Sequence, residues 1–272
     1  MKKLFIFSDI HSFFTELKKA LDNAGFDIDN PDHIAVSLGD LCDRGPESAE
    51  VLKFINSIPE KRKICIIGNH ELMMEEMISR GFELSHDVYN GTVKTVRQLT
   101  GIKNPEAAIL EMQHNYLWNL YKKSWRLHAE IGDMIFVHGW IPSKEVLSTW
   151  GIPKGEEFRP DWRNASEKEW EKATWANGMK MWSNGVREEG KTIFCGHWHT
   201  SWGHAYLHNY GVEFVEDNND PTVLSPGTVW PFACYDPFID DGIVAMDACT
   251  ALSHQVNVVV REVADEVWVD MK

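Results

Sequence analysis

The sequence predicts an α/β protein, and two observations lead to that prediction. Short runs of β-branched and aromatic residues recur along the chain and end on Gly or a polar residue, as buried strands do. Helical segments separate the first three runs, and alternating strands and helices indicate a parallel sheet covered by helices. The strand runs are LFIF (4–7), IAVSL (34–38), ICII (64–67), MIFV (134–137) and TIFC (192–195).

The segments between these runs show helical periodicity. Residues 13–25 place apolar side chains along one stripe and end in Gly, which is a common helix stop. Residues 46–58 begin with Pro in the first turn and carry apolar residues at helical spacing. A third helix is expected over 71–78. Further along, 105–123 predicts one long helix, followed by a strand near 127–131.

The pattern changes after residue 200. Short strands are predicted at 203–208, 212–215, 242–246 and 256–260, separated by loops rich in Asp, Asn, Pro and Gly. These strands favour a second, more antiparallel sheet. The chain shows no internal repeat, so we expect one domain over residues 1–272.

Residues 139–190 stand apart as a Trp-rich insertion between two of the strand runs. They lack strong strand runs, and two interpretations remain open. The segment is a helical insertion with Trp as core filler, or it is a cap that shapes a substrate cleft. Six of the 12 tryptophans lie here: Trp140, Trp150, Trp162, Trp170, Trp175 and Trp182.

Charge and composition exclude several classes of protein. The formal net charge is −14 without any Lys/Arg block, which argues against a chain that coats nucleic acid or an anionic membrane. No apolar stretch approaches the roughly 20 residues of a membrane span. Asp9 interrupts the N-terminal apolar run too early for a signal peptide. The five cysteines show no C-x-x-C spacing, so we expect reduced thiols in a cytoplasmic protein.

Each strand run leads into side chains that can hold a metal ion. In open α/β sheets, ligands collect beyond the carboxyl ends of the strands, so these side chains are expected to share one crevice. Mixed oxygen and imidazole donors suit Mn, Fe or Zn better than Ca or Mg. The candidate metal ligands are Asp9, His11, Asp40, Asn69, His138, His197 and His199.

Three further residues at the strand ends suit phosphoryl chemistry. Two ions bridged by a carboxylate lie roughly 3.5–4 Å apart and lower the pKa of bound water to about 7. The resulting hydroxide can attack phosphorus in line. Arg44 is a planar bidentate donor for phosphate. His70 can protonate the leaving alkoxide, and Asp43 is placed to orient its imidazole.

The motifs SDIH, GDLCDRG, GNHE, VHG and GHWH resemble those of the calcineurin-like metallophosphoesterases. GDLCDRG with GNHE resembles the phosphoprotein-phosphatase branch, particularly its compact bacterial and phage-type members. The resemblance implies a four-layer α/β/β/α sandwich with a dinuclear Mn, Fe or Zn centre, for which we favour two Mn²⁺ ions. By position, it implies Asp9, His11 and Asp40 on the first metal, with Asp40, Asn69, His138 and His197 on the second.

The same resemblance assigns the remaining site residues. Arg44 and His70 match the phosphate-binding arginine and the general-acid histidine, and Asp43 matches the partner of that histidine. Asn69 is also expected to contact substrate. His199 matches an extra histidine that broader metallophosphoesterases give to the first metal, and which simple phosphoprotein phosphatases usually lack.

The chain also departs from the family pattern. Ser8 and Ser12 take two usual glycine positions, and Trp140 places an indole after the histidine-glycine motif. The second phosphate-clamping arginine of a W-x-R stretch is replaced by Asn177 or Asn184. Arg163 or Arg187 is then a candidate substitute. Without a second arginine, the clamp on a phosphomonoester is weaker.

We expect a metal-dependent phosphoesterase, most simply a phosphomonoesterase of the serine/threonine phosphatase type. One alternative is a pyrophosphohydrolase of dinucleoside polyphosphates or other small nucleotides, although related enzymes tend to have A-R-G where this chain has Asp43-Arg44-Gly45. Another alternative is a non-catalytic metal-binding scaffold. The expected partner is a phosphorylated substrate, either a phosphoprotein or a small phosphate ester, and neither a membrane nor nucleic acid.

Overall fold

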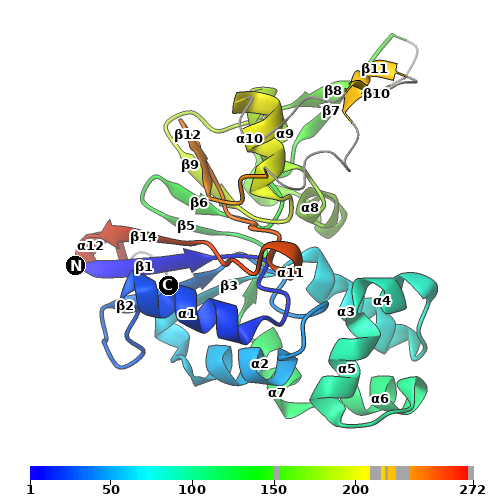
Figure 1. The fold of residues 1–272 in the computed structure, drawn as a ribbon. Coiled ribbons are helices and arrows are strands. Elements are labelled where there is room, and N and C mark those ends of the chain that lie inside the picture. Colours follow the sequence, from blue (N-terminus) through cyan, green and yellow to red (C-terminus); the bar gives the residue numbers. More distant parts are fainter. Residues whose placement is uncertain (150–152, 209–215, 218–219, 225–232, 269–272) are drawn as a thin grey trace.

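Two five-stranded sheets pack face to face in the computed structural model, which describes residues 1–149, 153–208, 216–217, 220–224 and 233–268 (Figure 1). The first sheet has the order β14 (Val258–Val263), β1 (Lys2–Phe7), β2 (His33–Ser37), β3 (Lys63–Ile66) and β4 (Trp125–Arg126). The second has the order β12 (Phe238–Asp240), β13 (Ile243–Ala245), β9 (Thr192–Cys195), β6 (Met134–Phe136) and β5 (Ala129–Ile131).

The first sheet is the predicted parallel sheet. Strands β1 to β4 run parallel, with Leu4 opposite Ile34 and Val36 opposite Ile64. Strand β14 adds an antiparallel edge next to β1. The predicted strand at 256–260 therefore exists, but it belongs to this sheet and not to the second one. Because β1, β2 and β3 are parallel, their carboxyl ends lie at one edge, where the polar motifs begin.

Both faces of the first sheet are buried. Along β1, Leu4 and Ile6 pack in the cluster between the two sheets, whereas Phe5 and Phe7 pack against helices. This alternation follows from the two-residue period of a strand. The covering helices are α1 (Phe14–Ala24), α2 (Ser48–Ser57), α3 (Asn69–Arg80), α4 (Ser85–Asn90), α5 (Thr92–Thr100), α6 (Pro105–Met112) and α7 (Tyr116–Lys122).

The insertion covers the outer face of the second sheet, which completes the four-layer α/β/β/α sandwich (Figure 1). Trp140, Trp162 and Trp170 are buried there, so the prediction of Trp as core filler is confirmed for these three. The expectation of a helical insertion is incomplete, because two strands that pair antiparallel as a hairpin also belong to it. This layer contains β7 (Lys144–Leu147), β8 (Pro153–Glu157), α8 (Glu167–Thr174), α9 (Gly178–Ser183) and α10 (Thr200–His208).

Two predicted elements are wrong in type or extent. The predicted strand at 203–208 is part of α10, which packs so tightly that a Cβ on Gly203 would lie 2.4 Å from Met179 Sδ. The predicted long helix over 105–123 is two helices, because the Asn115 side chain caps α7 by accepting a hydrogen bond from Trp118 N at 3.0 Å. The predicted strand at 212–215 lies outside the described residues.

None of the described helices is long and apolar enough to cross a membrane. All five cysteines are unpaired, as expected for a protein without a disulfide framework. The remaining short elements of the described chain are the 3₁₀ turns Glu60–Arg62 and Trp162–Asn164, β10 (Glu216–Asp217), β11 (Asp220–Leu224), α11 (Thr250–Ser253) and α12 (Asp265–Trp268).

Candidate metal centre and active site

The motifs at the strand ends converge where the two sheets meet. The loops after β1 and β2 are joined by backbone hydrogen bonds from Asp9 N to Gly39 O (3.1 Å) and from His11 N to Asp40 O (3.0 Å). The loop after β9 closes on them, since the backbone N–H of His197 donates to both carboxylate oxygens of Asp9 at 3.0–3.1 Å. Residues from both sheets therefore contribute to one buried site.

Asp40 lies at the centre of this site. Its carboxylate forms one possible metal-binding group with His11 and His70 and a second with His138 and His197, and the ligand atoms of each group lie within 4.8 Å of one another. Asp40 Oδ2 is 3.9 Å from the Nε2 atoms of both His11 and His70, and Oδ1 is 3.5 Å from His138 Nε2. One carboxylate therefore faces two possible cation positions.

The imidazoles are oriented for coordination by hydrogen bonds to the backbone. His11 Nδ1 lies 3.1 Å from Cys42 O, and His138 Nδ1 lies 2.7 Å from Leu38 O. His197 makes a similar bond to the backbone of Trp175. Such outer hydrogen bonds fix the tautomer and ring orientation of a metal-binding histidine. In His11 and His138 the other ring nitrogen, Nε2, faces Asp40 at 3.9 and 3.5 Å, so this donor set fits divalent ions.

Strained backbone is concentrated at the same place. Of the nine described non-glycine residues with positive φ, seven belong to the strand-end motifs. Such conformations cost energy in non-glycine residues and cluster at functional sites. The seven are Asp9, His11, Ser12, Asp40, Asp43, Arg44 and His197.

Two motif glycines are required by close approach. A Cβ on Gly68 would lie 2.1 Å from Asp40 Oδ1, and a Cβ on Gly196 would lie 2.1 Å from Asp9 Oδ2. Larger residues at these positions would therefore displace the carboxylates that the site brings together. Ser8 hydrogen-bonds the same Asp9 oxygen, so this departure from the family pattern is accommodated.

Charge is unevenly distributed over the site. Burial raises the pKa of Asp9, and the nearby Asp247 raises it further. Burial opposes ionisation of Asp40, but His138 and His70 outweigh it and hold the pKa of Asp40 well below its usual value. Burial likewise opposes charge on His138, yet Asp40 raises the pKa of His138 to about 10. Asp40 and His138 thus favour each other's charged forms, with Asp40 Oδ1 3.5 Å from His138 Nε2.

Metal binding is therefore expected to release a proton. At pH 7.5 the His138 imidazole, with a pKa of about 10, is protonated, whereas a coordinated imidazole is neutral. We expect Mn²⁺ binding to release about one proton and metal affinity to rise with pH over this range. Calorimetric titration in two buffers of different ionisation enthalpy measures the number. Binding heats that do not depend on the buffer would contradict this charge assignment.

His70, which belongs to one of the two possible metal groups, also forms a hydrogen-bonded pair with Asp43. His70 Nδ1 lies 2.7 Å from Asp43 Oδ2, and Asp43 is completely buried. Thr92 and Thr95 donate to the two oxygens of Asp43 at 2.7 and 2.8 Å, which holds its carboxylate in place. Burial lowers the pKa of His70, but Asp40 and Asp43 outweigh it and raise that pKa above its usual value. His70 is thus well placed to carry a proton.

Arg44 points into the same space. Its Nη1 lies 2.6 Å from His11 Nε2, and its Nη2 lies 3.1 Å from His70 Nε2. Burial and the Arg44 charge together hold the pKa of His11 well below its usual value, so His11 is neutral. A guanidinium beside His70 creates a local environment that favours an anion able to accept hydrogen bonds from both.

The structure does not place His199 in either of these groups. Its side chain is 45% exposed, and its Nε2 lies 3.8 Å from Asp247 Oδ2. Asp247 is buried, accepts a hydrogen bond from Cys249 N at 2.7 Å and acts electrostatically on Asp9. Asp247 was not among the predicted site residues, although it follows the apolar run of β13 as the other acids follow theirs.

Glu71 is a second residue that the sequence analysis missed. Its carboxylate accepts hydrogen bonds from the backbone N–H groups of Gly68, Asp40 and Leu41 at 2.8–2.9 Å. It therefore ties the loop after β2 to the start of α3. Its place as the third residue of that helix, in a capping box, was the available signal.

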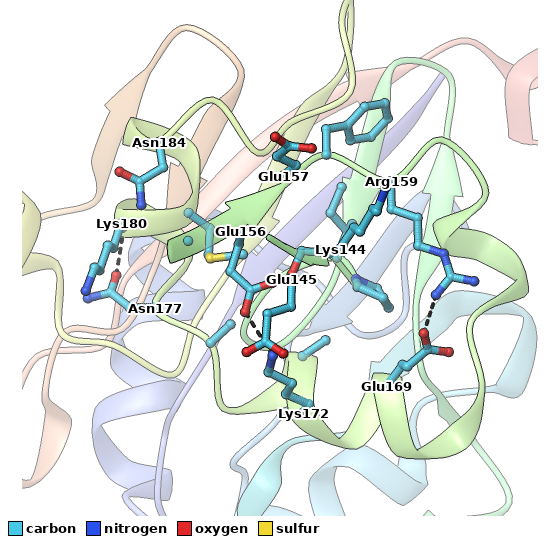
Figure 2. A pocket seen from close by; sticks show the side chains of 18 of the residues that line it. Lys144, Glu145, Glu156, Glu157, Arg159, Glu169, Lys172, Asn177, Lys180 and Asn184 are labelled. Atoms are coloured by element: carbon cyan, nitrogen blue, oxygen red, sulfur yellow. Dashed lines mark hydrogen bonds and ion pairs between the residues drawn. The ribbon is translucent and has the colours of Figure 1, made fainter. Parts of the chain in front are cut away.

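The two asparagines at the expected positions of a clamping arginine lie in the insertion. Asn177 caps α9 by accepting a hydrogen bond from Lys180 N at 3.0 Å, and Asn184 ends the same helix. Figure 2 shows both beside a cavity of about 1060 Å³ between the hairpin, α8 and α9. Its charged residues include the pairs Lys172–Glu156 and Arg159–Glu169, and none of the predicted metal ligands lines it.

Neither candidate replacement arginine contacts the predicted site in the described structure. Arg163 pairs with Glu130 and Glu188, and Arg187 donates to Asp241 O at 2.7 Å. Arg126, which the sequence analysis did not consider, lines a cavity of about 600 Å³ together with Asn69. Trp140, the indole that follows the histidine-glycine motif, is buried in the core of the insertion layer and donates to Val186 O at 2.6 Å.

The chain belongs to the calcineurin-like phosphoesterase family, whose model matches residues 2–225. This membership confirms the predicted resemblance, the fold class and the expectation of a hydrolase that acts on phosphate esters.

The individual relatives and solved structures share only a low sequence identity with this chain. The chain is 25% identical over 189 residues to an asymmetrical bis(5'-nucleosyl)-tetraphosphatase of Halalkalibacterium halodurans, covering 61% of this chain and 74% of the relative. It is 26% identical over 182 residues to that of Bacillus subtilis, covering 59% and 72%. A crystal structure of a putative diadenosine tetraphosphatase is similar at 13% identity and a TM-score of 0.48, over 95% of this chain and 89% of that one.

Proposed function

We propose that this phosphoesterase hydrolyses P–O bonds of small nucleoside polyphosphates at a centre of two divalent ions. The observation that carries the proposal is the placement of Arg44 and the His70–Asp43 pair against Asp40, which belongs to both possible metal groups. A phosphate binder, a proton donor and a potential bridging carboxylate are thus within a few ångströms of one another.

Asp9, His11 and Asp40 would hold the first ion, and Asp40, Asn69, His138 and His197 the second. We favour Mn²⁺, since the donors mix carboxylate and amide oxygens with imidazole. When bound, the ions would activate water as the nucleophile and neutralise charge on the phosphate. His199, whose Nε2 lies 3.8 Å from Asp247 Oδ2, is proposed as a further ligand of the first ion.

The protein's own residues would orient the phosphate and move a proton. Arg44 donates two parallel hydrogen bonds to non-bridging oxygens, which suits its planar guanidinium. His70 donates a proton from Nε2 to the leaving oxygen while Nδ1 remains bonded to Asp43. Asp43 acts as a positioning residue, because Thr92 and Thr95 hold its carboxylate. Asn69 lies at the start of α3, where it would contact both substrate and metal.

The lack of a second arginine at the expected position supports a nucleotide over a phosphoprotein. Asn177 is engaged as a helix cap, and Arg163 is engaged by two glutamates. The relatives named as tetraphosphatases point in the same direction. A second candidate is the phosphomonoesterase of the serine/threonine phosphatase type, which the intact Asp43-Arg44-Gly45 sequence favours.

A substrate panel under Mn²⁺ tests the proposal. Diadenosine tetraphosphate, a phosphoserine peptide and a bis-aryl phosphodiester are compared by their kcat/KM. We expect the dinucleotide to give the highest value, with two nucleotides as products and no free inorganic phosphate in the first turnover. A higher kcat/KM for the phosphopeptide would establish the second candidate in its place.

A further inference from the structure

An aromatic cleft of about 780 Å³ opens beside His197 and His199. Helix α10 and the turn before it supply three of its rings. Trp202 and Tyr206 stack with centroids 5.2 Å apart and 22° between their planes, and Trp198 lies edge-on to Trp202 at 6.4 Å. The described lining residues are Trp175, His197, Trp198, His199, Ser201, Trp202, Ala205, Tyr206, Ala233, Tyr235 and Leu252.

Three aromatic rings of this cleft are exposed to solvent, which is unfavourable in free energy. Trp198 is 40%, Tyr206 48% and Trp175 49% exposed, whereas Trp140, Trp162 and Trp170 of the same layer are buried. Leaving such apolar area in water forgoes the free energy of burial. Exposed apolar patches rimmed by polar groups are typical of binding surfaces. The cleft is therefore better explained by a ligand than by packing.

The lining defines the chemistry of that ligand. Apart from the two histidines, the described lining residues include no acidic or basic side chain. Its polar groups include the hydroxyls of Ser201, Tyr206 and Tyr235. A phosphate chain or a charged peptide side chain would find no counter-charge among these described residues apart from the two histidines. A flat, uncharged ring with hydrogen-bonding edges would stack on the indoles and meet the hydroxyls, and a nucleobase has these properties.

The cleft is continuous with the candidate metal centre. His197 belongs to one of the possible metal groups and also lines the cleft, and Trp175 packs edge-on to it with ring centroids 5.7 Å apart. A substrate whose phosphate occupies the metal centre therefore presents its next group to the aromatic wall. We infer that this cleft binds the nucleobase of the substrate, an assignment that rests on the proposed nucleotide function and names Trp202 and Tyr206 as specificity residues.

The test compares two substrates that differ only in the nucleoside. The ratio of kcat/KM for ATP to that for inorganic tripolyphosphate is measured for the wild type, Trp202→Ala and Tyr206→Ala. Base stacking is worth about 1–3 kcal/mol, so the ratio is expected to fall about 5- to 150-fold in each variant. Trp202→Phe keeps a ring and should restore most of the ratio. Tyr116→Ala, which removes a 74% exposed ring from α7, is the matched control.

Binding of adenosine alone separates this inference from the proposed function. Quenching of tryptophan fluorescence by adenosine should be seen in the wild type and weaken in Trp202→Ala. If adenosine binds this way but ATP, tripolyphosphate and diadenosine tetraphosphate are all left unhydrolysed, the proposed function fails and the cleft assignment stands. An unchanged ATP ratio, or equal adenosine binding by the wild type and Trp202→Ala, would overturn the assignment. A third result would also overturn it. If Trp202→Ala lowered only the ratio of kcat/KM for phosphotyrosine to that for phosphoserine, the cleft would bind an aryl ester and not a nucleobase.

Discussion

Replacing His70 with Asn is expected to lower kcat by about 10²- to 10⁴-fold on an alkyl phosphate ester, whose leaving alkoxide needs a proton. The imidazole is held by Asp43 at 2.7 Å, and its pKa is raised by Asp40 and Asp43. It can therefore supply a proton to a leaving oxygen that departs poorly as an anion. Asparagine preserves a polar side chain of similar size but carries no proton that it can transfer.

The leaving group separates this role from a structural one. With a 4-nitrophenyl ester, whose leaving group needs no proton, the loss in His70→Asn should be at least about tenfold smaller. Metal content, measured by mass spectrometry, should remain at the wild-type value. His114→Asn, at an exposed histidine of the helical layer, is the control. Equal losses for both leaving groups at full metal content would contradict the role of general acid.

Replacing Asp40 with Asn should have the largest effect on metal binding. Its two oxygens face different sets of imidazoles, with His138 on one side and His11 and His70 on the other. An amide has no charge and only one oxygen, so it cannot bridge two cations. Removing residues that only support a ligand already costs about 10–100-fold in affinity or activity. We therefore expect a loss of more than about 100-fold in activity.

Metal stoichiometry is the direct measurement for this variant. Equilibrium dialysis against Mn²⁺ should give two ions for the wild type and at most one for Asp40→Asn. Asp29→Asn, which removes a carboxylate from an exposed turn, should bind as the wild type does. Two tightly bound ions in Asp40→Asn would show that Asp40 does not bridge them.

The strand ends could be predicted because their signals are local. Runs such as LFIF and ICII are short, apolar and closed by Gly or polar residues, so both the strands and the polar residues after them follow from the chain itself. Residues 203–208 could not be assigned in this way, because a short run of aromatic and small residues suits either a strand or a helix. Packing against Met179 and Phe238 decided the outcome.

The site residues also differ in whether a local sequence signal predicts them. Asp9, Asp40 and His138 follow strand runs directly, and the structure brings them together. Arg163 is held away from the predicted site by Glu130, 33 residues before it, and Glu188, 25 residues after it. No local sequence pattern reveals these two ion pairs. Asp247 was predictable in principle, since it follows the β13 run, but its relation to His199 and Asp9 is purely tertiary.

Carboxylates and imidazoles from both sheets are proposed to hold two neighbouring ions in one shared site. Crystals grown with Mn²⁺ and measured at its absorption edge test this claim most directly. We predict two anomalous peaks roughly 3.5–4 Å apart, with Asp40 between them. Asp9 and His11 should lie on one peak, and Asn69, His138 and His197 on the other. A single peak, or peaks away from Asp40, would contradict the account.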